Sequence, residues 1–113
     1  GDTRSLMKFH PKIAPITAAI FPLVKKNGMP EVARKIQEDL QQHFHAFYDE
    51  KGAIGRRYRR MDEVGTPFCV TVDGESVEEG SVTVRHRDTM EQDRIPAENV
   101  AAYMIDAIRD WKP

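Results

Sequence analysis

Residues 52–73 read GAIGRRYRRMDEVGTPFCVTVD, and this stretch decides the fold because its pattern changes abruptly. Ile54, Tyr58 and Met61 stand at helical spacing, which predicts an amphipathic helix whose apolar side packs on a sheet. A glycine then separates the helix from residues 68–72, an apolar run typical of a buried strand. The stretch therefore indicates a helix followed by a strand within an α/β domain.

Two strands and a helix are predicted upstream of this stretch. Residues 16–23 are almost continuously apolar, which indicates a strand covered on both faces, as in a parallel α/β sheet. After an Asn-Gly turn, apolar residues recur at helical spacing from Val32 to Phe44. A short strand is expected at residues 45–49.

Two hairpins are predicted downstream. An acidic turn at residues 73–79 leads into a strand at residues 81–87, where apolar and polar residues alternate. A tight connection at residues 88–89 then leads into a last strand at residues 91–95. Pro96 opens a terminal helix with a clear apolar side.

The predicted order of elements is therefore β-α-β-α-β-β-β-α. The first three strands should be parallel because helices join them through right-handed crossovers, and the two hairpins make the fourth strand antiparallel. Helices on both faces give a three-layer α/β/α domain around a mixed five-stranded sheet. The 113 residues suffice for one such domain, expected at residues 13–113 after a linker-like stretch at residues 1–12.

Composition narrows the class of protein. A hydrophobic fraction of 40% and a charged fraction of 31% indicate a soluble globular protein. No apolar run approaches the roughly 20 residues that a membrane-spanning helix needs, so we expect no membrane partner. The single cysteine, Cys69, excludes an internal disulfide and suits a reducing compartment such as the cytoplasm. It lies inside a predicted inner strand, where a packed thiol is expected.

The helix of the opening stretch carries four arginines, although the net charge of the chain is only −1: Arg56, Arg57, Arg59 and Arg60. Crowded cations repel one another, and a fold tolerates them best where a polyanion neutralises them. Gly52 and Gly55 mark the helix start, where free N–H groups attract anions. The alternative is a solvated face whose cations pair with Asp62, Glu63 and other acids.

A second charged group surrounds the last hairpin and comprises Arg85, Arg87, Asp88, Glu91 and Arg94. The planar fork of arginine suits phosphates and base edges, while a carboxylate accepts hydrogen bonds from a cytosine amino group. A strand end that carries both positive and negative side chains can therefore bind single-stranded nucleic acid and recognise its bases. A structural interpretation, in which these residues form cross-strand ion pairs, stays equally open.

No pattern amounts to a complete active site. His43 and His45 lack a specific metal-ligand spacing, and the loop after the first strand lacks a phosphate-loop ending. We therefore expect neither a catalytic residue nor a metal or cofactor site in these residues.

Three segments, taken in order, resemble the C-terminal anticodon-binding domain of glycyl-tRNA synthetase, the homodimeric class II type. The first is API at residues 14–16, with PL at residues 22–23. The second runs from IGRRYRR at residue 54 through GTPFCVTVD, and the third is VTVR at residue 82 followed by RDTMEQ at residue 87. The resemblance covers roughly residues 11–111.

This resemblance implies a strand order of 2-1-3-4-5, with only the fourth strand antiparallel. It implies that the complete enzyme joins glycine to tRNA, using ATP and magnesium in a separate upstream catalytic domain, and is a homodimer. This fragment would act as a monomer that grips the anticodon stem-loop. It would check the glycine anticodon, whose second and third letters are both cytosine.

The resemblance also assigns roles by position. Base and backbone contacts near the last hairpin would come from Arg85, Arg87, Asp88, Thr89 and Glu91. The acids would accept hydrogen bonds from cytosine amino groups, and the arginines would hold phosphates or cytosine carbonyls. Neighbouring phosphates, or the interface with the catalytic domain, would fall to Arg56, Arg57, Arg59 and Arg60. Three positions depart from the family pattern, which usually has aspartate at His86, glutamine at Met61 and an aliphatic residue at Asp93.

Two other functions remain open. One is a non-catalytic interaction or dimerisation module of the same fold, as in the accessory subunit of mitochondrial DNA polymerase; the RDTMEQ segment favours the synthetase over it. The other is a small thiol enzyme built on Cys69, which predicts rapid alkylation of the native protein.

Overall fold

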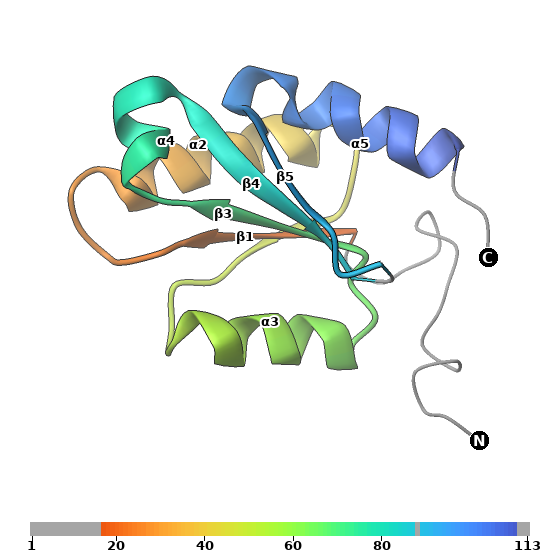
Figure 1. Cartoon of the computed structure of the whole chain (residues 1–113), viewed down its shortest axis with the longest axis horizontal. Coiled ribbons are helices and arrows are strands. Elements are labelled where there is room, and N and C mark those ends of the chain that lie inside the picture. The colour runs from red at the N-terminus through yellow and green to blue at the C-terminus, as the bar shows by residue number, and fades with distance from the viewer. Residues whose placement is uncertain (1–16, 88, 111–113) are drawn as a thin grey trace.

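The computed structural model describes residues 17–87 and 89–110, which form a sheet with helices on both faces (Figure 1). The expected linker at residues 1–12 lies outside the described residues, as do Asp88 and Trp111. The elements are β1 (Ala18–Pro22), α2 (Met29–Gln41), β2 (Ala46–Tyr48), α3 (Ile54–Glu63), β3 (Phe68–Val72), α4 (Gly74–Glu79), β4 (Ser81–His86), β5 (Gln92–Pro96), the 3₁₀ turn η2 (Ala97–Asn99) and α5 (Val100–Arg109).

The sheet has five strands in the order β2-β1-β3-β4-β5. β1 pairs in parallel with β2 and β3, whereas β4 pairs antiparallel with β3 and β5. The predicted fold class, the strand order implied by the family resemblance and the antiparallel fourth strand are therefore confirmed.

The central strands bury both of their faces, as the apolar run of residues 16–23 predicted. Ala18 and Ile20 of β1 belong to a large core under α2 and α5. Ala19 and Phe21 belong to a smaller core under α3, which also contains Met61. Successive residues of a strand point to opposite faces, so a strand between two helical layers needs apolar residues at every position.

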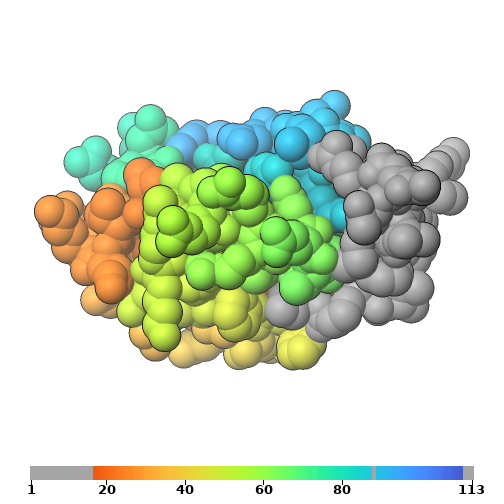
Figure 2. Space-filling view, turned by 90° about the horizontal axis from the view of Figure 1, so that it is seen from below, coloured from red at the N-terminus to blue at the C-terminus, as the bar shows by residue number. Residues whose placement is uncertain are grey.

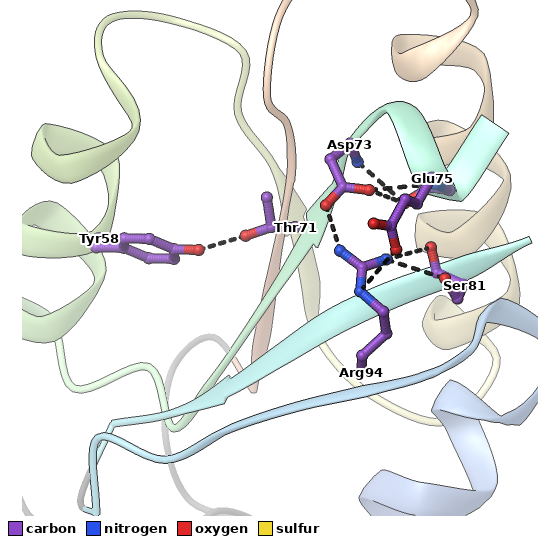
Figure 3. Close-up of polar contacts among 7 residues, drawn as sticks. Tyr58, Thr71, Asp73, Glu75, Ser81 and Arg94 are labelled. Atoms are coloured by element: carbon purple, nitrogen blue, oxygen red, sulfur yellow. Dashed lines mark hydrogen bonds and ion pairs between the residues drawn. The ribbon is translucent and has the colours of Figure 1, made fainter. Parts of the chain in front are cut away.

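The acidic turn predicted at residues 73–79 is wrong, because these residues form α4 between β3 and β4. The carboxylate of Asp73 accepts a hydrogen bond from the Ser76 backbone N–H at 3.1 Å, and the Ser76 hydroxyl accepts one from the Asp73 N–H at 2.9 Å. This capping box starts a helix that has almost no apolar periodicity. Arg94 of β5 pairs with Asp73 and with Glu75, which ties α4 to the sheet (Figure 3).

Among the described helices, α3 is the one on its face of the sheet, and its two ends lie near opposite ends of the central strands (Figure 1). Arg57, near its start, contacts the backbone at the carboxyl end of β1. Asp62, near its end, contacts Arg85 and Arg87 beside the β4–β5 connection. The helix therefore contacts two separate regions, one through Arg57 and the other through Asp62.

Candidate nucleic-acid interface

Arg57 is an interior residue with an exposed fraction of only 3%. Its guanidinium donates hydrogen bonds to the carbonyl oxygens of Pro22 at 2.7 Å, Leu23 at 3.2 Å and Asp49 at 3.3 Å. It also lies over the ring of Phe21, 5.6 Å from the centroid. Burial lowers the pKa of this guanidinium, although Asp49 opposes the shift. Arg57, predicted to contact phosphate or the catalytic domain, is thus bound within this domain.

Arg60 has an acidic partner, as the alternative interpretation of the arginine helix expected. Its Nη2 donates to Asp49 Oδ2 at 2.6 Å and to the Lys51 carbonyl at 2.9 Å. The partner is not Asp62 or Glu63 but a residue that follows β2, eleven positions earlier. Because the side chain of Arg60 is still 42% exposed, the ion pair leaves it partly accessible.

Arg56 and Arg59 are the exposed arginines of α3. Within residues 17–87 and 89–110, neither has an ion-pair partner. Figure 2 looks onto this face of the molecule, where α3 (green) lies across the middle. The basic face of α3 therefore consists of these two side chains, with Arg60 at its margin.

Arg85 is also buried, with an exposed fraction of 7%. Its two terminal nitrogens donate to the two carboxylate oxygens of Asp62 at 3.1 and 3.2 Å. The guanidinium lies over the Tyr58 ring, 4.9 Å from its centroid. The hydrogen bonds with Asp62 raise the pKa of Arg85 further, so it stays charged. With its fork occupied, Arg85 does not fit the predicted direct contact with RNA. Its partner lies on α3, so this ion pair is not one of the cross-strand pairs of the structural interpretation.

Arg87, Thr89 and Glu91 lie together around the β4–β5 connection. Arg87 is half-buried, and its Nε donates to the Asp62 carbonyl at 3.1 Å. Thr89 and Glu91 are exposed, and the Thr89 hydroxyl accepts a hydrogen bond from the Glu91 N–H at 3.2 Å. Asp88, the remaining candidate, lies outside the described residues. The structure thus brings three of the predicted residues to one accessible tip.

Met90 belongs to the same tip and was given no role by the sequence. Its side chain is 53% exposed, and its backbone adopts the left-handed conformation with φ of 65°. Its N–H donates to the His86 carbonyl at 2.8 Å, while the His86 N–H donates to the Glu91 carbonyl at 2.8 Å. The only available signal was its place in the RDTMEQ segment, because the backbone conformation of one methionine cannot be inferred from a pattern.

Two departures from the family pattern turn out to be neighbours. The Tyr103 hydroxyl of α5 donates to Asp93 Oδ2 at 2.5 Å, and His86 Nε2 lies 2.5 Å from the same hydroxyl oxygen. Burial raises the pKa of Tyr103, and the hydrogen bond to Asp93 raises it further. His86 therefore faces α5 and not the α3 side, and it fixes the start of the hairpin to the terminal helix.

Cys69 does not support a thiol enzyme. It is 1% exposed, and burial raises the pKa of its thiol to about 12. A thiol with that pKa forms little thiolate near neutral pH.

The described part of the chain also contains no helix that is both long and apolar enough to cross a membrane.

The sequence matches the family model described as "Anticodon binding domain" over residues 17–107. It is 58% identical over 101 residues to a glycine–tRNA ligase of Rhodopirellula baltica, covering 89% of this chain and 19% of that protein. It is 54% identical over 112 residues to a glycine–tRNA ligase of Borrelia hermsii, covering 99% of this chain and 25% of that protein. The chain thus spans about a fifth to a quarter of these relatives.

Solved structures show the same fold. A prolyl-tRNA synthetase of Cryptosporidium parvum, complexed with halofuginone and AMPPNP, superposes with a TM-score of 0.84 at 21% sequence identity. The match covers 91% of this chain and 22% of that one. A second structure of that synthetase, with L-proline and AMP, gives a TM-score of 0.83.

Proposed function

Since this chain belongs to the anticodon-binding domain family, we propose that it recognises the anticodon stem-loop of glycine tRNA as one domain of a glycine–tRNA ligase. The observation that carries this proposal is its 58% identity to a glycine–tRNA ligase over 89% of the chain. At that identity the residues around the hairpin and α3 are expected to serve the same ligand. The names of the relatives also favour the ligase over the polymerase-accessory module.

The complete enzyme would contain much more than this domain, because the chain covers only 19% and 25% of two of its relatives. It would attach glycine to tRNA with ATP and magnesium in an upstream catalytic domain, connected through the linker at residues 1–12. We propose that this enzyme is a cytoplasmic homodimer and that the isolated domain, residues 13–113, is a monomer. ATP and magnesium would bind the catalytic domain.

The hairpin tip would read the bases of the loop. Its exposed residues offer a carboxylate at Glu91, a hydroxyl at Thr89 and an apolar side chain at Met90. A carboxylate accepts hydrogen bonds from the cytosine amino group, and an apolar side chain packs against an unstacked base. Arg87 would supply charge at the base of the tip, and Asp88 remains a second candidate acceptor.

The basic face of α3 would hold the phosphate backbone. Arg56 and Arg59 are exposed and lie on the same outward face of the helix. Charges of this kind attract any polyanion, so they contribute affinity without reading sequence. Base discrimination is therefore assigned to the hairpin and general affinity to α3.

The test is binding of the domain to a glycine anticodon stem-loop, compared with the same loop carrying a changed base at either cytosine position. At low salt we expect at least tenfold discrimination, about 1.4 kcal/mol. Equal affinity for all three loops would overturn base reading by this domain. A complete lack of binding would favour the interaction module.

A further inference from the structure

Asp62 holds both arginines that begin the hairpin, through two different groups. Its carboxylate accepts a hydrogen bond from each terminal nitrogen of Arg85, at 3.1 and 3.2 Å. Its backbone carbonyl accepts one from Arg87 Nε at 3.1 Å. The last turn of α3 and the end of β4 are therefore joined at a single residue.

Arg85 also contacts the hairpin tip. Arg85 Nη2 lies 3.2 Å from the sulfur of Met90, whose backbone is left-handed. Residues with a side chain rarely adopt that conformation, and they keep it only where surrounding contacts hold it. Arg85 provides one such contact, because its buried guanidinium, which stays charged, reaches Met90 at the tip.

The other side of Arg85 is anchored to the sheet. Its guanidinium lies over the Tyr58 ring, and the Tyr58 hydroxyl shares a hydrogen bond with the hydroxyl of Thr71 on β3 (Figure 3). The chain of contacts thus runs from the sheet through Tyr58 and Arg85 to Met90. Such a chain fixes the direction in which the tip points.

We propose that Asp62 and Arg85 are positioning residues for anticodon recognition: they set the conformation of Arg87 and of residues 89–91, and they do not contact the RNA. The inference rests on the proposed function, since it explains how the hairpin is held for its ligand. It replaces the predicted direct contact of Arg85 with an indirect one. The carboxylate of Asp62 would repel phosphate, and Arg85 neutralises it.

The first experiment compares Asp62→Asn with Glu63→Gln. Both changes remove one negative charge from the same turn of α3, but Glu63 is exposed and lies outside the contacts described above. We expect Asp62→Asn to reduce discrimination between the glycine loop and its altered versions from at least tenfold to about threefold or less. Glu63→Gln should keep full discrimination. Retained discrimination in Asp62→Asn would overturn the proposal.

The salt dependence of binding separates positioning from direct contact. Loss of one phosphate contact to a single strand lowers the slope of log affinity against log salt by about 0.7. Arg85→Gln should leave this slope unchanged. The double variant with Asp62→Asn and Arg85→Gln should lose no more discrimination than each single variant loses. A lower slope, or losses that add, would mean that Arg85 contacts the RNA directly and would overturn the proposal.

The methyl resonance of Met90 in the RNA-free protein provides a readout that does not depend on binding. Asp62→Asn should shift it, and Glu63→Gln should not. If Asp62→Asn does not fold, Asp62→Glu serves instead, with the same expected shift. An unmoved resonance would overturn the proposal. Failure of the unchanged protein to bind any loop would overturn the proposed function. This resonance would then still test whether the contact between Asp62 and Arg85 sets the conformation of the tip.

Discussion

Burial distinguishes two arginines that are neighbours in the sequence. Arg56 is exposed, whereas Arg57 is 3% exposed and binds three backbone carbonyls. The helical pattern contained a signal for this, since Arg57 lies three residues after Ile54 and four before Met61, on the face that packs against the sheet. The carbonyls that it satisfies come from two other elements, so no local pattern could have revealed them.

Arg57→Met should destabilise the domain. It removes a charged donor from the carbonyls of Pro22 and Asp49, and leaving buried acceptors without a partner costs about 2–3 kcal/mol in the free energy of unfolding. Arg56→Met, at the exposed neighbouring position, should change it by less than about 0.5 kcal/mol. Urea unfolding of both variants tests this. Arg57→Met that is as stable as the unchanged protein but binds RNA poorly would restore the predicted phosphate contact.

The helices and strands differ in how much of their structure the sequence revealed. The strand alternation at residues 81–87 correctly placed Val84 and Arg85 on opposite faces. It did not reveal that the Arg85 face is covered by α3, because the partner Asp62 is 23 residues away in the chain. Contacts between distant elements depend on how those elements pack, and a local sequence pattern does not predict that packing.

α4 was missed for a different reason. Its six residues contain one apolar side chain, Val77, which is 42% exposed, so no hydrophobic period marks the helix. The capping box between Asp73 and Ser76 was present in the sequence as Asp-x-x-Ser. That signal was outweighed by the Asp-Gly pair, which is typical of a turn.

Asp73 should make the stability of the domain sensitive to acid. Burial opposes its ionisation, but hydrogen bonds from Arg94 and Ser76 together outweigh burial and lower its pKa below the ordinary 3.8. A lowered pKa contributes stability above the unfolded-state value, and that contribution is lost as the pH falls through the folded-state value. The free energy of unfolding should therefore decrease as the pH is lowered from about 5.

Asp73→Asn isolates this contribution, because asparagine caps a helix as well as aspartate does but cannot ionise. Between about pH 5 and pH 2 it should lose less stability than the unchanged protein, by about 1 kcal/mol or less. Glu75→Gln removes a more exposed partner of Arg94, 3.4 Å away, and should retain the acid sensitivity. Urea unfolding across this pH range measures the difference. If Asp73→Asn and the unchanged protein lose the same free energy of unfolding over this range, Asp73 does not cause the acid sensitivity.

At the scale of the whole molecule, the residues predicted the layers, the parallel first three strands and the antiparallel fourth. The order of the strands came from the family resemblance, because residue patterns do not say which strands are neighbours. The largest difference concerns the charged residues. Packing divides the described ones into a basic face on α3 with Arg56 and Arg59, a hairpin tip at residues 87 and 89–91, and buried arginines that hold the fold.

From this division we expect the anticodon bases to contact the hairpin tip and the phosphates to contact α3. The most direct test is the change in backbone amide resonances of the labelled domain when the glycine anticodon stem-loop is added. We expect the largest changes at residues 87 and 89–91, and these changes should become smaller when a cytosine of the anticodon is replaced. We also expect changes at Arg56 and Arg59 that persist with every loop. Changes confined to α2 and α5, with the hairpin unaffected, would contradict both expectations.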